Sequence, residues 1–72
     1  MAKYYFTDEN GTKQFIKSID FANGKLTFTE NDGDAFVGRD GYYAIPLRDQ
    51  IRHSFVDDYP QVEKIECIAP YY

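Results

Sequence analysis

One stretch in the second half of the chain carries its apolar residues at helical spacing, and this pattern constrains the fold more than any other. Leu47, Ile51 and Phe55 recur at every fourth position, with mostly polar residues between them. Such a stripe forms one apolar face of an amphipathic helix. Pro46 suits a first helical turn and no deeper position, so the pattern predicts a helix over residues 46–57. This apolar face needs a sheet to cover it.

The remaining residues read as short strands and turns. The strand-like runs are rich in β-branched and aromatic residues. Two Asn-Gly pairs, at residues 10–11 and 23–24, favour two-residue hairpin turns of type I′ and therefore an antiparallel meander of three strands. We expect strands at residues 3–7, 13–21, 25–30, 35–37 and 62–68, of which the fourth is brief and the last follows the helix.

The two turns also predict which strand residues face each other. The first turn places Tyr5 opposite Ile16, on the outer face of the sheet, and the second places Ala22 opposite Lys25. The predicted fold class is α+β in one domain over residues 1–72, with the helix packed on one face of the sheet. The sheet residues expected on that face are Phe6, Phe15, Ile19, Phe21, Leu26 and Phe28.

Charge and length narrow the classes of function. The formal net charge is −4, the acidic residues concentrate after residue 29, and no basic stripe is present. This balance disfavours direct nucleic-acid binding and suits a cationic protein partner. No apolar run approaches the roughly 20 residues that span a bilayer, and no charged-then-apolar leader opens the chain. We therefore expect no membrane partner and a cytoplasmic location.

No constellation of residues indicates catalysis, so an enzyme is not expected. Cys67 is the only cysteine, which excludes an internal disulfide, and it stands in an apolar run where a small buried thiol is ordinary. His53, the only histidine, lies on the polar side of the predicted helix. His53 and Asp57 are spaced so that two ligands could reach one metal ion, but two ligands do not make a site. We expect solvated charges there and no cofactor.

Three Tyr-Tyr pairs, at residues 4–5, 42–43 and 71–72, are the most informative feature of the surface. Successive strand residues point to opposite faces, so one tyrosine of a strand pair must leave the core. Exposed tyrosine among carboxylates is typical of protein contacts, because tyrosine gives a large contact area with little loss of entropy. Tyr5 and Ile16 could equally form only a cross-strand pair or be covered by the C-terminal tail. The predicted partner-binding residues are Asp32, Asp34, Asp40, Asp57, Asp58, Tyr5, Tyr42 and Tyr43.

The opening residues 3–6 (Lys-Tyr-Tyr-Phe), the hairpin over residues 16–31 and the closing residues 62–66 (Val-Glu-Lys-Ile-Glu) together resemble small accessory proteins encoded by phages and prophages of Gram-positive bacteria. In character the chain is similar to anti-CRISPR proteins. The resemblance implies a non-enzymatic inhibitor in the bacterial host cell, a nucleic-acid mimic whose acidic, tyrosine-containing surface occupies the basic groove of a defence nuclease. The alternatives are a metal-binding regulatory or structural phage protein and a self-assembling, dimeric phage module.

Overall fold

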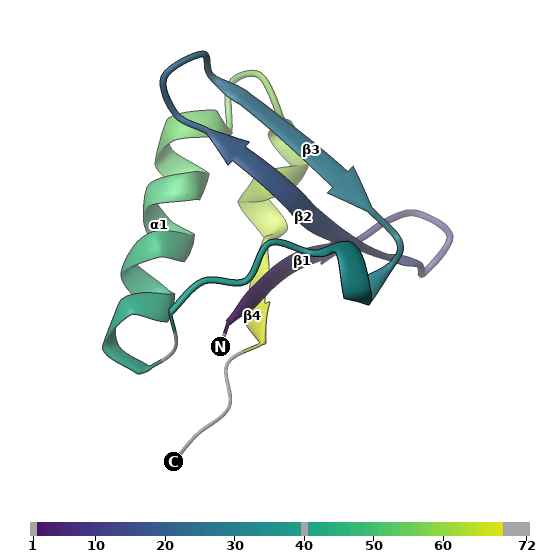
Figure 1. Ribbon diagram of the computed structural model, residues 1–72. Helices are drawn as coiled ribbons and strands as arrows, with labels where there is room; N and C mark the ends of the chain where they lie inside the picture. The colour runs from purple at the N-terminus through teal and green to yellow at the C-terminus, as the bar shows by residue number, and fades with distance from the viewer. Residues whose placement is uncertain (1, 40, 69–72) are drawn as a thin grey trace.

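Antiparallel strands form one sheet, with an α-helix beside it (Figure 1). The computed structural model describes residues 2–39 and 41–68. Along the sheet the strands are ordered β3-β2-β1-β4, and every neighbouring pair is antiparallel. The predicted α+β class is therefore confirmed. The elements are β1 (Lys3–Thr7), β2 (Lys13–Asp20), β3 (Lys25–Thr29), η1 (Asp32–Asp34), η2 (Gly41–Tyr43), α1 (Ala44–Phe55), η3 (Pro60–Lys64) and β4 (Glu66–Ile68), where η denotes a short 3-10 helix.

The predicted helix is present, but it begins and ends two residues earlier than expected. It covers Ala44–Phe55 and follows directly on η2. Pro46 therefore occupies the third helical position, where an N–H would have no acceptor within the helix, so its missing donor costs nothing. Ile51 and Phe55 are buried, as the apolar stripe predicts.

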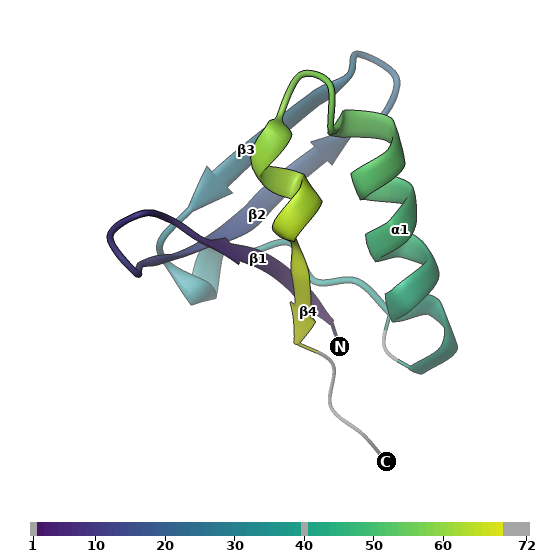
Figure 2. The same ribbon diagram turned by 180° about the vertical axis from the view of Figure 1, so that it is seen from behind.

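The core lies between the sheet, α1 and η3, which pack against the same face (Figure 2). Val62 enters this core from η3, and the strand predicted over residues 62–68 is reduced to β4. Pro60 is the reason, because its fixed φ starts a helical turn that continues to Lys64. Cys67 on β4 is only half-buried, although it packs against the core. The fully enclosed core residues are Ala2, Tyr4, Ile16, Leu26, Ala44, Ile51, Phe55, Val62 and Ile65.

The β1–β2 hairpin has a different register from the predicted one, because its loop is not a type I′ turn. Tyr5 pairs with Phe15, not with Ile16. The backbone N–H of Gly11 donates to the carbonyl of Asp8 at 3.0 Å, and Gly11 alone in this loop has a positive φ, of 79°. This is a type I turn followed by a left-handed glycine, which makes the loop one residue longer. The Asp8 carboxylate closes it by accepting hydrogen bonds from two backbone N–H groups.

The β2–β3 hairpin also has a longer loop than predicted. Asp20 pairs with Lys25, so residues 21–24 form the loop and the expected pairing of Ala22 with Lys25 is wrong. Only Gly24 has a positive φ here, which rules out the type I′ turn at Asn23. The Asp20 carboxylate accepts hydrogen bonds from the backbone and side-chain nitrogens of Asn23.

Phe21 consequently lies outside the sheet. Its side chain is 45% exposed, although its ring packs against Phe55 with centroids 5.3 Å apart. The expectation that Phe21 belongs to the buried face is therefore wrong.

A bulge at Lys17 reverses the faces of the first half of β2. The pairing with β3 shifts between Ile16 and Ser18, so that Ile16 and Ile19 both face the core. Ile16 is completely buried, and the expected outer position for it is wrong. Phe15, its neighbour, points to the other face and packs on Tyr5, with ring centroids 5.8 Å apart.

Residues 35–37 are extended but do not form the brief strand that was predicted. The N–H of Phe36 donates to Ile16 at 2.8 Å, while Gly38 exchanges two hydrogen bonds with Ala2. The segment thus fills the gap where β1 diverges from β2, and it leads from the end of β3 to the start of α1 (Figure 1). Its partners belong to two different strands, so no continuous ladder forms.

Candidate protein-binding surface

Exposed apolar side chains gather around the start of α1. Among the described residues, six large apolar side chains are exposed, and four of these lie here. Tyr42 is 94% exposed, the highest value among them. We call the four residues the apolar end; they are Val37, Tyr42, Tyr43 and Ile45.

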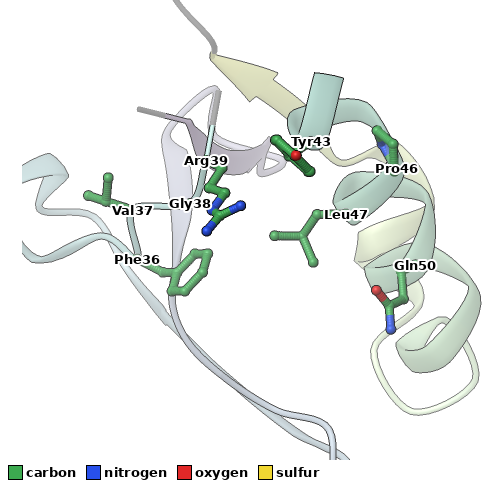
Figure 3. A pocket seen from close by; sticks show the side chains of 8 residues that line it. All are labelled: Phe36, Val37, Gly38, Arg39, Tyr43, Pro46, Leu47 and Gln50. Carbon is green, nitrogen blue, oxygen red and sulfur yellow. The ribbon is translucent and has the colours of Figure 1, made fainter. Parts of the chain in front are cut away.

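An open groove of about 570 Å³ lies beside the apolar end, between residues 36–39 and the first turns of α1 (Figure 3). The side chains of Phe36 and Leu47 point toward each other across it. Gly38 lets the two walls approach, because a Cβ at this position would lie 3.2 Å from Phe36 and 3.5 Å from Leu47. The groove is therefore formed by close packing of two segments that are separate in the sequence. Its lining consists of Phe36, Val37, Gly38, Arg39, Tyr43, Pro46, Leu47 and Gln50.

Arg39 is the one charged residue of this lining. Its guanidinium carbon lies 5.1 Å from the centroid of the Tyr43 ring, within the range of a cation–π interaction. Arg48 and Arg52 approach the Asp49 carboxylate at 3.3 and 3.5 Å. Arg39, in contrast, forms no ion pair with any residue in the described part of the chain. Within the described part of the chain, the mostly apolar lining of the groove thus contains one guanidinium that has no ion-pair partner there.

The predicted acidic residues do not form one surface. Asp32 and Asp34 lie in η1: Asp32 pairs with the Lys3 ammonium, and Asp34 accepts a hydrogen bond from Asn31. Asp57 and Asp58 are exposed just after the C-terminal end of α1. Asp40 lies outside the described residues.

Two predicted contact residues, Tyr42 and Tyr43, lie on η2 and are also far from the acidic pair that follows α1. Tyr42 and Tyr43 precede α1, whereas Asp57 and Asp58 follow it. A helix of 12 residues is about 18 Å long, so the two groups stand at opposite ends of α1. The structure brings Tyr43 to the groove and leaves Tyr42 exposed on η2, while the carboxylates of Asp32, Asp34, Asp57 and Asp58 are not part of the groove lining.

Tyr5 lies on the outer face of the sheet, as predicted, but it is half-buried among neighbours. Phe15 packs on its ring, and the Lys13 ammonium lies 4.8 Å from its centroid. Hydrogen bonding to the Glu66 carboxylate, which stands opposite Tyr5 in the sheet, raises the pKa of its hydroxyl. These contacts match the cross-strand alternative more closely than a free contact surface.

The titratable groups elsewhere serve the fold. Hydrogen bonds, from Gln14 to Asp8 and from Asn23 to Asp20, hold the pKa values of both aspartates below their usual range. Burial raises the pKa of the Cys67 thiol, which disfavours a reactive thiolate. His53 and Asp57, the predicted metal candidates, are exposed on α1 and just after it, and within the described ranges no group of three or more His, Cys, Asp or Glu side chains could hold an ion.

Sequence reasoning missed most of the groove. It selected Tyr43 but not Phe36, Arg39 or Gln50, because nothing in the local sequence shows that residues 36–39 pack on α1. The available signal was the Tyr-Tyr pair directly before the amphipathic helix. Two large neighbouring rings at the start of a helix cannot both be buried by it, so one of them must be exposed.

Comparison with known protein families, curated proteins and solved structures found no match for this chain. Within residues 2–39 and 41–68, no helix is long and apolar enough to cross a membrane.

Proposed function

We propose that this domain acts without catalysis, by binding another protein through its apolar end. The observation that supports this function is that exposed aromatic and aliphatic side chains lie together beside a groove that is open to solvent. Contiguous exposed apolar surface marks interaction sites, whereas scattered apolar residues do not. Tyrosine and arginine, both present here, are enriched at the centres of protein interfaces.

The target proposed for this binding is a bacterial defence nuclease, and the domain would be its anti-CRISPR-like inhibitor. The resemblance to small phage proteins and the net charge of −4 support this choice. The exposed carboxylates would steer the protein toward a groove rich in lysine and arginine, as complementary charge does in association. The apolar end would then provide the contact area that keeps the complex together.

DNA cleavage assays test this function directly. The purified protein is titrated into reactions of a panel of RNA-guided nucleases from Gram-positive bacteria, and the cleaved fraction is measured. We expect inhibition of at least one nuclease, and at least a tenfold loss of potency when Tyr42 and Tyr43 are both replaced by serine. The absence of inhibition across the panel would contradict the proposed target.

A matched control separates the contact surface from the fold. Phe21→Ser also removes an exposed aromatic ring, but from the opposite end of α1, where Phe21 lies against Phe55. Thermal melting followed by circular dichroism shows whether each variant is folded under the assay conditions. If the Tyr42→Ser, Tyr43→Ser variant inhibits as well as the parent, the apolar end is not the contact.

Self-assembly is a second candidate, favoured by one observation. β3 is at the edge of the sheet, and its outer side pairs with no strand in the described part of the chain. An unpaired edge can accept a strand from a second copy. Light scattering over a range of protein concentrations tests this, and a mass that stays that of a single chain at every concentration would contradict it.

A further inference from the structure

We propose that the groove between residues 36–39 and α1 is a docking site for a short peptide segment of the partner, in which an apolar side chain stands next to an acidic one. This inference rests on the proposed protein-binding function and names the chemistry that the site would recognise. In this proposal the apolar part of the groove binds the apolar side chain of the peptide, and Arg39 binds its carboxylate.

The apolar part of the site is already formed. The groove has the volume of a small ligand pocket, which typically measures about 300–1,000 Å³. Its walls, Phe36 and Leu47, face each other, and the backbone of Gly38 lies beside both of them. An apolar side chain entering between them would therefore replace water without requiring the backbone to rearrange.

The charge of the site selects an anion. The Arg39 guanidinium stands over the Tyr43 ring and forms no ion pair with a described residue, and we assign its N–H donors to the incoming carboxylate. Arginine suits this role because its planar fork can bind both oxygens of a carboxylate. Although the chain as a whole is acidic, this groove is complementary to a negative group.

The shape and the number of charges favour a peptide over a nucleic acid. The groove is open along its length, which suits a side chain that belongs to a continuing chain. A phosphate backbone would need several cations in a row, and the lining contains only Arg39. A second copy of this chain is the remaining competitor, and the test below distinguishes it.

The test is an NMR titration of the isotope-labelled full chain with three blocked peptides. The first is Ser-Gly-Phe-Glu-Gly-Ser, and the other two carry Gln or Lys in place of Glu. We expect the Glu peptide to shift the amide signals of Val37, Gly38, Arg39 and Leu47. We also expect it to bind about tenfold more tightly than the Gln peptide, as a charge-assisted pair is stronger than a neutral one.

Charge reversal provides the decisive variant. Arg39→Glu should invert the preference, so that the Lys peptide binds best, and Arg39→Gln should abolish the difference between the peptides. Arg48→Gln is the matched control, because Arg48 is a nearby arginine that already reaches Asp49. Equal binding of all three peptides to the parent, or no shifts at millimolar peptide, would overturn the proposal.

Two further readings separate this inference from the proposed function and from self-association. If Arg39→Glu inhibits a nuclease as well as the parent while Tyr42→Ser, Tyr43→Ser does not, the proposed function stands and the groove inference falls. If the peptides bind selectively but no nuclease is inhibited, the groove inference stands without that target. A molar mass that rises with protein concentration in light scattering, and no longer does so in Arg39→Glu, would show that a second copy of this chain occupies the groove. That result would overturn the proposal that the groove binds a peptide segment of another protein.

Discussion

The hydroxyl of Tyr4 donates a hydrogen bond of 3.0 Å to the backbone carbonyl of Ala44, and both residues are buried. This bond joins β1 to the first turn of α1, 40 positions later in the chain. It satisfies a hydroxyl that would otherwise be buried without a partner. The Tyr4 ring also lies within 3.5 Å of where a Cβ of Gly38 would stand, so the same residue supports the floor of the groove.

Removing this hydrogen bond should lower the stability of the fold without creating a cavity in the core. We expect Tyr4→Phe to lower the free energy of unfolding by about 0.5–1.5 kcal/mol, the usual net contribution of one such bond. Urea unfolding followed by circular dichroism measures the change. Tyr42→Phe is the control, because it removes a hydroxyl from a tyrosine that is 94% exposed. Equal effects of the two variants would show that the Tyr4 bond contributes nothing specific.

Tyr4 should also make the protein sensitive to alkali. Burial, the largest cause, raises the pKa of its hydroxyl from 10.0 to about 12, so the folded state favours the neutral form. The contribution to stability is complete below pH 10 and is lost as the pH rises through about 12. The amount by which the unfolding free energy of the parent exceeds that of Tyr4→Phe should therefore fall over this interval. A constant difference between the two proteins up to pH 12 would contradict the assignment.

The packing of α1 on the sheet depends on Ile51, which is completely buried. Truncation to alanine removes apolar contacts and leaves a cavity, so Ile51→Ala should lower the free energy of unfolding by about 2–5 kcal/mol. Ile45→Ala is the matched control on the same helix, since Ile45 is 47% exposed and should change stability by about 0.5 kcal/mol or less. Chemical denaturation of both variants checks the difference, and similar midpoints would mean that the buried face of α1 is assigned wrongly.

Gly24 is required by its backbone conformation and not by its surroundings. Its φ is +66°, yet no atom lies within 4 Å of where a Cβ would stand. We expect Gly24→Val to destabilise the protein by about 1–2 kcal/mol through backbone strain alone. Gly24→Asn should cost less, because asparagine tolerates the left-handed conformation. Thermal melts of the two variants test this, and equal melting temperatures would show that the loop can adopt another geometry.

The acidic groups should affect association more than stability. We expect replacement of Asp32, Asp34 and Asp40 by asparagine to leave the melting temperature nearly unchanged, because exposed charges contribute little to folding. The same variant should associate more slowly with an inhibited nuclease and show a flatter dependence on salt. Surface plasmon resonance at low and high salt measures both effects. Asp57→Asn with Asp58→Asn, at the other end of α1, shows which acidic group steers the encounter, and unchanged rates for both variants would exclude steering by these carboxylates.

The sequence by itself determined the elements whose information is local. The apolar stripe at Leu47, Ile51 and Phe55 can be buried in only one way, so α1 and its buried face followed from spacing alone. β1 was predicted with its observed bounds for a similar reason, since turn residues delimit it. The α+β class, with three strands before the helix and one after it, needed no tertiary information, although the additional strand predicted at residues 35–37 is absent.

Only the tertiary structure decided the registers and the groove. The carboxylates of Asp8 and Asp20 accept hydrogen bonds from residues within or across their loops. These bonds stabilise loops that are longer than the two residues that Asn-Gly suggests. The bulge at Lys17 then turns Ile16 inward, because burying Ile16 and Ile19 on the same face outweighs regular strand pairing. The groove depends on residues 36–39 filling the gap beside β1 and meeting α1. Such long-range packing leaves no periodic trace in the sequence, which is why Tyr43 is the one residue of the groove lining among the predicted contact residues.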